Sequence, residues 1–573
     1  MYTADIKKLP RHFVPADFVI KDWNSLAPYF EQLDARAINS VADLEQWLRD
    51  SSELESVISE DACWRQIKMT CDTENKELEE SFNFFMLEIQ PRMQPWSDKL
   101  NRKLIDCPFT AKLDPQKYFT YLRNVRKHID LYRENNIPII AELNVLQQQF
   151  GVVAGKMTVE VNGTEYTLQQ AAKFLEDENR ELREEVYRKI AARRYQDHEE
   201  LDELFDQLLQ KRHQLAVNAG LPDYRAYRFL ELGRFDYNKE MCYQFHDAVR
   251  EHVMPLVNAI YAGKQKKLKL ETLRPWDVEA EPAGTKPLRP FQNGEELTEK
   301  TIACFNKMRP FFGDCLAKMR SMGHLDLESR KGKAPGGYNC PLAESGAPFI
   351  FMNAAGTLDD VTTMVHEGGH AIHSFLSHPL ELNGFKEYPT EIAEVASMTM
   401  ELFSMDQWDV FFTNGEELTR AKEQQLERVI TIFPWIATID KFQHWIYENP
   451  VHTREQRKEI WLSILKEFSS PLIDFTGLDN YRSYHWQKQL HLYEVPFYYI
   501  EYGIAQLGAI GLWMQYKKNP EQAIQHYLDA LALGGTCTLP ELFEAAGLQF
   551  DFSAGPISEL MKFVNSELEN IGQ

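Results

Sequence analysis

The sequence has few cysteines, and no two of them form a C-x-x-C pair. Its eight cysteines are scattered along 573 residues, which excludes the disulfide frame of a small secreted protein. The same scatter argues against a cysteine zinc site. We therefore expect reduced thiols, most of them buried and inert, and a cytoplasmic location.

Long apolar runs are also missing. The chain starts MYTADIKKLPRHFVPADF, which has neither the apolar core nor the small-residue cleavage site of a secretory signal. The stretch IAQLGAIGLWMQY near the C-terminus is too short and too interrupted to cross a bilayer. We expect no secretory signal and no membrane-spanning helix.

Positive charge is in deficit. The chain has 63 Lys and Arg residues against 86 Asp and Glu residues, so its net charge is −23. This surplus of negative charge repels phosphate backbones and anionic lipid head groups. We therefore expect neither nucleic acid nor a membrane surface as a partner.

Strand signals are scarce, and the hydrophobic pattern is mostly helical. Residues 168–219 carry apolar stripes with the helical period, contain no proline and end before Gly220, which suits a helix C-cap. Similar patterns predict helices at 42–59, 72–102, 114–150, 239–268, 298–322, 420–446, 453–468 and 557–570. Prolines inside several of them, such as Pro434, predict kinks or breaks. We expect a mainly α fold, with an N-terminal helical region at 1–190 and a larger catalytic region at 191–573.

Two short segments are exceptions to the helical pattern. In MTVEVNGTEYTL (157–168), Asn162 and Gly163 separate alternating β-forming residues, which is typical of a β-hairpin. The segment PFIFMN (348–353) predicts one further short strand.

The sharpest motif is HEGGH, which begins at His366. Residues four apart lie on one face of a helix, so His366 and His370 can bind one metal ion. Glu367 then lies beside the metal, within reach of a water molecule. Thr357 and Asp360 form a capping-box pattern that starts a helix ahead of the motif. The pattern predicts a metallopeptidase site, against the alternative of two ordinary histidines on a half-exposed helix.

A third metal ligand should come from another segment. The sequence PTEIAEVASMTMELF (389–403) starts a helix after its proline and places Glu391 and Glu394 on one face among small and apolar neighbours. A carboxylate in such surroundings is costly to bury without a cation. Spacing alone does not choose between the two glutamates, and a solvated glutamate in the first helical turn is the plain alternative.

These motifs occur in four ordered blocks, at 332–339 (GKAPGGYN), 346–373, 391–402 and 491–503 (HLYEVPFYYIEYG). In this pattern the sequence resembles family M3 of the zinc peptidases, the group of thimet oligopeptidase and oligoendopeptidase F. It is most similar to the oligoendopeptidase F branch. Four blocks at family-like intervals are far more specific than one pentapeptide.

The resemblance assigns roles to the residues that match the family's motifs. It implies that His366, His370 and Glu394 bind one Zn²⁺ ion and that Glu367 is the catalytic base. Glu391 then becomes a carboxylate that orients a ligand imidazole through its free N–H. The implied activity is that of a zinc-dependent endopeptidase that hydrolyses short unstructured oligopeptides.

The resemblance also implies catalytic donors near the C-terminus. His491, Tyr498 and Tyr502 could share one helical face and stabilise the transition state, with Tyr498 preferred to Tyr502. The match is less tidy here, because Val495 or Pro496 occupies one tyrosine position of the thimet-like pattern.

The family fold implies an elongated body of many helices split by a deep substrate channel, with zinc on its floor and a small β element near the active site. Such a channel admits short peptides and excludes folded proteins. The PFIFMN strand would then offer a free edge to an extended peptide. Gly368 and Gly369 leave room for another backbone or for substrate, and we expect His373, which completes HExxHxxH, to pack in the core.

Two alternatives remain open. A zinc carboxypeptidase on a similar helical channel fold also uses HExxH, but it needs a group that binds the terminal carboxylate, and no motif identifies one. A peptide-binding protein without catalysis is the other alternative, and the intact HExxH motif argues against it. Cobalt or manganese could occupy the same ligands in vitro.

Overall fold

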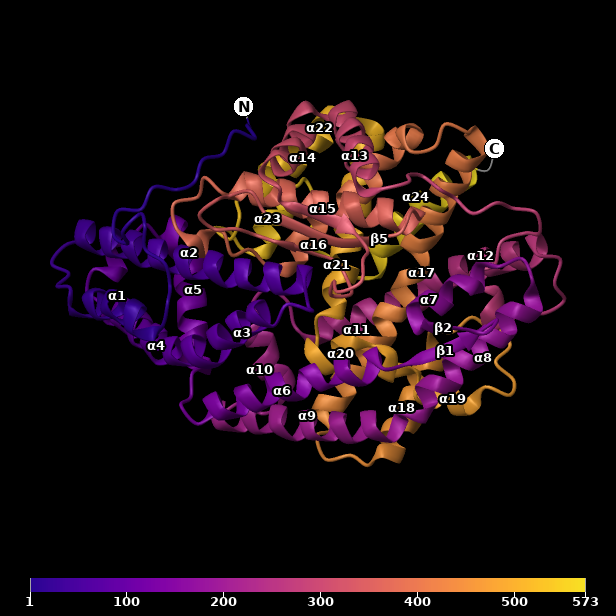
Figure 1. The fold of residues 1–573 in the computed structure, drawn as a ribbon, viewed down its shortest axis with the longest axis horizontal. Helices are drawn as coiled ribbons and strands as arrows, with labels where there is room; N and C mark the ends of the chain where they lie inside the picture. Colours follow the sequence, from indigo (N-terminus) through magenta and orange to yellow (C-terminus); the bar gives the residue numbers. More distant parts are fainter. Residues whose placement is uncertain (1, 572–573) are drawn as a thin grey trace. The chain divides into compact units, whose positions relative to one another are not determined.

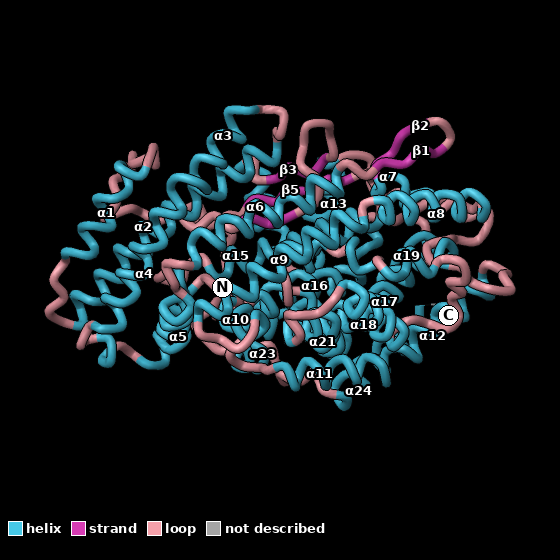
Figure 2. The backbone as a smooth tube through the Cα atoms, turned by 90° about the horizontal axis from the view of Figure 1, so that it is seen from below, coloured by secondary structure: helices cyan, strands magenta, loops and turns pink. Residues whose placement is uncertain are grey.

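The computed structural model describes residues 2–571. Helices make up most of this part of the chain, and the strands form two small sheets (Figure 2). The mainly α fold predicted from the sequence is therefore confirmed. Within the described residues, no helix combines the length and the apolar character needed to cross a bilayer. All eight cysteines are free thiols, as expected.

The described chain divides into two compact units, each built from three segments. Unit 1 takes residues up to 132, 288–422 and 505–550. Unit 2 takes residues 133–287, 423–504 and 551 onward. The boundary at residue 190 expected from the sequence concerns functional regions, and it stays a prediction.

Unit 1 contains the N-terminal helices, a three-stranded sheet and the helix with the HEGGH motif (Figure 1). Its helices and strands are α1 (Trp23–Ala35), α2 (Val41–Cys71), α3 (Lys76–Phe84), α4 (Gln90–Asp106), α5 (Pro115–Leu131), α13 (Gly294–Met308), α14 (Pro310–Met322), β3 (Leu325–Glu328), β4 (Tyr338–Cys340), β5 (Phe349–Ala354), α15 (Leu358–Ser377), α16 (Thr390–Ser404), α22 (Pro520–Ala532) and α23 (Leu539–Ala545). Helices α1, α2, α4 and α5 share one hydrophobic core, into which Phe385 also packs.

Unit 2 contains the β-hairpin and the remaining helices. They are α6 (Asn136–Gly155), β1 (Thr158–Val161), β2 (Thr164–Thr167), α7 (Leu168–Ala172), α8 (Arg180–Gln196), α9 (His198–Ala219), α10 (Tyr224–Glu231), α11 (Lys239–Ala248), α12 (Met254–Lys267), α18 (Arg454–Glu467), α19 (Asp479–Ser483), α20 (Leu490–Glu494) and α24 (Ala554–Ile571). Most of α17 (Gly415–Glu448) and the start of α21 (Tyr499–Lys518) also belong to this unit.

The predicted hairpin is confirmed. Strands β1 and β2 pair antiparallel, and Asn162 and Gly163 connect them with φ values of 52° and 77°. Two positive φ angles are what a tight two-residue hairpin turn requires, and Asn-Gly is the dipeptide that adopts them most readily.

The long helical run predicted at 168–219 is helical but divided. Asn179 caps α8, with its side chain accepting hydrogen bonds from the first-turn backbone, and a break at Asp197 separates α8 from α9. The run ends at Gly220, whose φ of 80° gives the left-handed cap predicted from the sequence.

The prolines inside the predicted helical segments have different effects on the helices. Pro91 and Pro255 each follow a short π-helical turn, and Pro310 begins α14 after a break in the helical pattern. By contrast, α17 continues through Pro434 without a break.

The PFIFMN segment forms β5, but the expectation of a free edge is wrong. The strand order of the sheet is β3-β5-β4, so β5 is the central strand. It pairs parallel with β3 on one side and antiparallel with β4 on the other. The two neighbours are only four and three residues long, and such short strands carry too little alternation to predict.

Candidate active site

Helix α15 carries the HEGGH motif, and its N-terminus is capped as predicted. Thr357 accepts a hydrogen bond from the backbone N–H of Asp360, and the Asp360 carboxylate accepts one from the backbone N–H of Thr357. Asp359 and Asp360 in the first turn also favour the positive end of the helix dipole. The cap fixes where the helix begins and therefore which residues face its neighbours.

Three side chains converge next to this helix. Nε2 of His366 lies 3.4 Å and Nε2 of His370 lies 3.7 Å from Oε2 of Glu394, which comes from α16. The ligand atoms of all three lie within 4.8 Å of one another. Atoms that bind one zinc ion at about 2.0–2.2 Å lie roughly 3.3–3.6 Å apart. Two imidazoles and one carboxylate in this arrangement fit one divalent cation.

A fourth side chain orients the first imidazole. Oε1 of Glu401 lies 2.7 Å from Nδ1 of His366, so the imidazole N–H donates to this carboxylate and leaves Nε2 facing Glu394. Burial alone would lower the pKa of His366, but hydrogen bonds with Glu394 and Glu401 raise it well above its usual value. The two carboxylates therefore favour a positive charge at this position, as the ligands of a cation do.

Glu391 was predicted for this orienting role, and Glu401 was not among the predicted site residues. Glu391 is buried on the same helix. The available signal was the position of Glu401, which follows Glu394 by two helical turns and so lies on the same face of α16.

Glu367 is buried next to the two histidines, with 7% of its surface exposed. Its Oε2 atom has no hydrogen-bond partner among the described residues. The pKa of Glu367 is raised to about 7, mainly by burial; the charges of Glu394 and Glu401 contribute to the rise, and His366 opposes it. A carboxyl group with such a pKa can accept and return a proton near neutral pH.

The two glycines of the motif allow close packing around α15. A Cβ atom at Gly369 would lie 2.5 Å from the carbonyl oxygen of Ala396 and 2.6 Å from Cα of Ser397, both in α16. A Cβ atom at Gly368 would lie 2.7 Å from the ring of Phe305. The prediction that the glycines make room for another backbone is therefore confirmed at Gly369. This approach brings Glu394 to the histidines.

His373 packs in the core, as expected. It is fully buried and stacks on Tyr388, with 3.6 Å between the ring centroids. Burial lowers the pKa of His373 well below its usual value, so the ring is neutral.

The C-terminal candidates belong to unit 2. The ring centroid of His491 lies 5.8 Å from that of Tyr498 and 6.0 Å from that of Tyr502. The three rings therefore form one aromatic cluster, but not on one helix. His491 lies on α20, Tyr502 lies on α21, and the backbone between the two helices turns at Phe497, whose φ is 66°.

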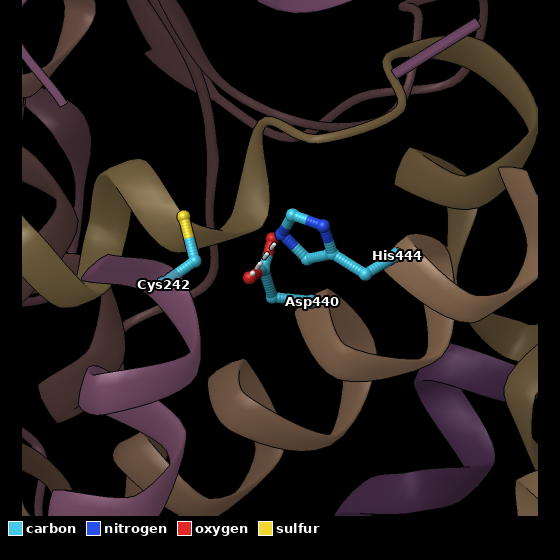
Figure 3. Close-up of side chains that lie close together, drawn as sticks. All are labelled: Cys242, Asp440 and His444. Atoms are coloured by element: carbon cyan, nitrogen blue, oxygen red, sulfur yellow. Dashed lines mark ion pairs between the residues drawn. The ribbon is translucent and has the colours of Figure 1, made fainter. Parts of the chain in front are cut away.

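A second group of potential metal ligands lies in unit 2 (Figure 3). Asp440 and His444 lie one turn apart on α17, and Cys242 faces them from α11. Oδ2 of Asp440 lies 2.8 Å from Nε2 of His246 and 3.4 Å from Nε2 of His444. Burial raises the pKa of Cys242 well above its usual value, and its thiol donates to the carbonyl of Asn238. This group is a buried polar network, in which the hydrogen bond between His246 and Asp440 links α11 to α17.

Comparison with known proteins identifies the family of this chain. The model of peptidase family M3 matches residues 173–561, and the model of the peptidase M3 N-terminal domain matches residues 13–132. The chain belongs to peptidase family M3, which confirms the family recognised from the motifs.

The curated relatives support the oligoendopeptidase F branch. An oligoendopeptidase F homolog from Borreliella burgdorferi is 24% identical over 66% of this chain and 63% of its own length. A second, from Lactococcus lactis, is 23% identical over 68% of this chain and 65% of its own length. The aligned region therefore covers slightly less than two thirds of these relatives.

Solved structures match along nearly the whole chain. The structure described as PZ peptidase A with inhibitor 2 has a TM-score of 0.90 and 26% identity, with coverage of 98% of this chain and 99% of that one. A putative oligoendopeptidase F from Bacillus anthracis has a TM-score of 0.85 at 24% identity, again with 98% and 99% coverage. The second match shows the fold alone.

Proposed function

We propose that the protein is a zinc-dependent endopeptidase that hydrolyses short unstructured oligopeptides. The observation that carries this proposal is the convergence of His366, His370 and Glu394 within 4.8 Å of one another. Family membership and the names of the curated relatives point to the same activity.

In this proposal His366, His370 and Glu394 hold one zinc ion, and Glu401 orients His366. When bound, zinc supplies Lewis acidity towards a carbonyl oxygen and lowers the pKa of water. Glu367 accepts the proton of the attacking water and then delivers it to the amine that leaves. Its buried, unpartnered oxygen suits this proton transfer.

His491, Tyr498 and Tyr502 are proposed as hydrogen-bond donors that stabilise the transition state, with Tyr498 the first choice. Their support is the aromatic cluster that they form and the resemblance of the 491–503 block to the family. Donors aimed at a developing negative charge give a large catalytic gain. The cytoplasmic location, and the absence of nucleic acid and membrane among the partners, stay predictions.

A mixed peptide library with mass-spectrometric mapping of the fragments tests the activity. The endopeptidase proposal predicts cuts at internal bonds of short peptides and no cleavage of folded proteins. Stepwise loss of single C-terminal residues would instead support the zinc carboxypeptidase.

The substitution Glu367→Gln tests the role of the general base. It keeps the size of the side chain but cannot accept the proton, so kcat should fall by about 10²- to 10⁴-fold while zinc is retained. Zinc content measured on the same preparation is the control. Undiminished turnover with zinc present would contradict the assigned role.

A further inference from the structure

Unit 2 encloses a cavity of about 380 Å³ that the mechanism above does not use. Apolar and aromatic side chains from α8, α12 and α17 form much of its wall, including Ile190, Val257, Pro434 and Trp435. The volume and this lining are typical of a site for a small ligand. Apolar walls alone would accept an apolar ligand of any kind. The basic residues of the cavity therefore determine which ligands it selects.

Four basic residues line the cavity. Arg194 comes from α8 and Arg482 from α19, while His485 and Lys488 lie at the two ends of one 3-10 turn. None of the described residues that line the cavity is Asp or Glu. The contrast with the chain as a whole is strong, because 86 of its 573 residues are acidic.

Two of these basic side chains, the half-buried Arg194 and the exposed Lys488, have no polar partner of their own among the described residues. Within the described part of the chain, the side chains of Arg194 and Lys488 form no ion pair and no hydrogen bond. Nζ of Lys488 lies 4.4 Å from the ring centroid of Trp435. Arg482 donates to the hydroxyl of Ser469 at 3.3 Å, but its Nε–H has no partner among the described residues.

The electrostatic state of the cations agrees with this geometry. Loss of solvation in the cavity and, to a smaller extent, repulsion from Arg194 together lower the pKa of Lys488 to about 8. Burial also lowers the pKa of Arg194 itself. His485 has a pKa well below its usual value because of burial and of the positive charges of Lys488, Arg194 and Arg482. An anion bound among them would reverse these effects.

We propose that this cavity binds the C-terminal carboxylate of a peptide whose last residue is apolar. Arg194 and Lys488 pair with the carboxylate, and the wall around Trp435 and Ile190 surrounds the side chain. A C-terminal residue carries its carboxylate and its side chain on the same Cα atom. The two groups therefore lie as close together as the basic residues and the apolar wall of this cavity. This inference rests on the proposed function, since it names the feature by which peptides are selected.

Calorimetric titration of the full-length Glu367→Gln variant tests the proposal without cleavage of the ligand. Three peptides are compared: one ending in phenylalanine with a free carboxylate, the same peptide with an amidated C-terminus, and the amidated peptide with an added internal glutamate. The free acid should bind about 10- to 100-fold more tightly than either amide, as expected for charge-assisted hydrogen bonds.

Variants then assign this preference to the cavity. Arg194→Gln and Lys488→Gln should each reduce the preference for the free acid by about tenfold. Lys466→Gln removes an exposed lysine of α18 that does not line the cavity, and it should leave the preference intact. Circular dichroism on each variant verifies the fold.

A pH series separates a charge effect from a shape effect. Lys488 faces Arg194, His485 and Arg482, and it is the group of this set with a pKa near 8. Affinity for the free acid should therefore fall as pH rises above about 8. Lys488→Arg, whose charge persists, should remove this fall.

Equal affinity for the free acid and the amide would overturn the proposal. The proposal would also be overturned if the amidated peptide with the internal glutamate bound as tightly as the free acid, because the site would then recognise a side-chain carboxylate. An unchanged preference in both cavity variants would also overturn it. Peptide hydrolysis by the wild-type chain is measured separately, so either conclusion can fail while the other stands.

Discussion

At the scale of single residues, Glu401 sets the orientation in which the His366 imidazole can bind a cation. Its carboxylate accepts the Nδ1–H of the ring at 2.7 Å and thereby fixes the tautomer with Nε2 free. The motif HExxH predicts which residues are ligands, but it carries no information about the group that orients them. Only the packing of α16 against α15 shows that group.

The substitution Glu401→Gln tests this role. It should weaken zinc affinity by about 10- to 100-fold, because the amide holds the imidazole less strongly and removes a negative charge. Competition with a chelator measures the affinity. Glu391→Gln, on the same helix, serves as the matched comparison and should have the smaller effect. A larger loss in Glu391→Gln would restore the assignment made from the sequence.

At the scale of elements, the close contact between α15 and α16 positions Glu394. Gly369 is the point of closest approach, since an added Cβ would meet the backbone of α16 at 2.5 Å. The two helices and the cap at Thr357 were visible in the sequence through their hydrophobic stripes and capping pattern. Their contact was indicated in the sequence only by Gly368 and Gly369, which were expected to leave room for another backbone or for substrate.

The substitution Gly369→Ala should lower the free energy of unfolding by about 1–3 kcal/mol, because the two backbones must separate. Urea denaturation, together with zinc affinity, measures the effect. Gly151→Ala in α6 is the control, because a Cβ there meets nothing within 4 Å. It should be neutral or stabilising by up to about 1 kcal/mol. Equal stability of the two variants would contradict the proposed close packing.

The small sheet shows where sequence patterns stop being informative. The segment 348–353 was recognised as a strand because it is a continuous apolar run with β-forming residues. Its partners β3 and β4 have four and three residues, too few for a periodic signal. The central position of β5 follows from these partners, so it could not be predicted from the strand alone.

At the scale of the whole molecule, long-range contacts between residues of opposite charge should control acid stability. Burial alone would raise the pKa of Asp277, but hydrogen bonds from Arg180 and Arg183 lower it overall. His444 and His246 lower the pKa of the buried Asp440 in the same way. The contacts of Asp277 with the two arginines, and the contact of Asp440 with His246, could not be predicted from the sequence, because the partners are distant along the chain and share no motif.

A carboxyl group with a lowered pKa in the folded state stabilises the fold above its unfolded pKa, and this contribution is lost as the pH falls. The unfolded value for Asp is about 3.9. The urea concentration at the unfolding midpoint should therefore stay constant near neutral pH. It should decrease once the pH is below about 4. Asp277→Asn should lower the free energy of unfolding at pH 7 by about 3–5 kcal/mol, because it leaves the buried Arg183 unpaired.

This variant should also show a weaker loss of stability between pH 5 and pH 3 than the wild type. A urea midpoint that stays constant from pH 7 to pH 3 would contradict the role assigned to these carboxylates.

The most direct test of the account is the metal content of the purified chain and of two variants. The account predicts one zinc ion per chain, lost in Glu394→Ala and retained in Cys242→Ser, because the cluster of Cys242, Asp440 and His444 is a buried hydrogen-bonded network. Zinc that is retained in Glu394→Ala and lost in Cys242→Ser would place the metal at Cys242, Asp440 and His444, and this result would contradict the account.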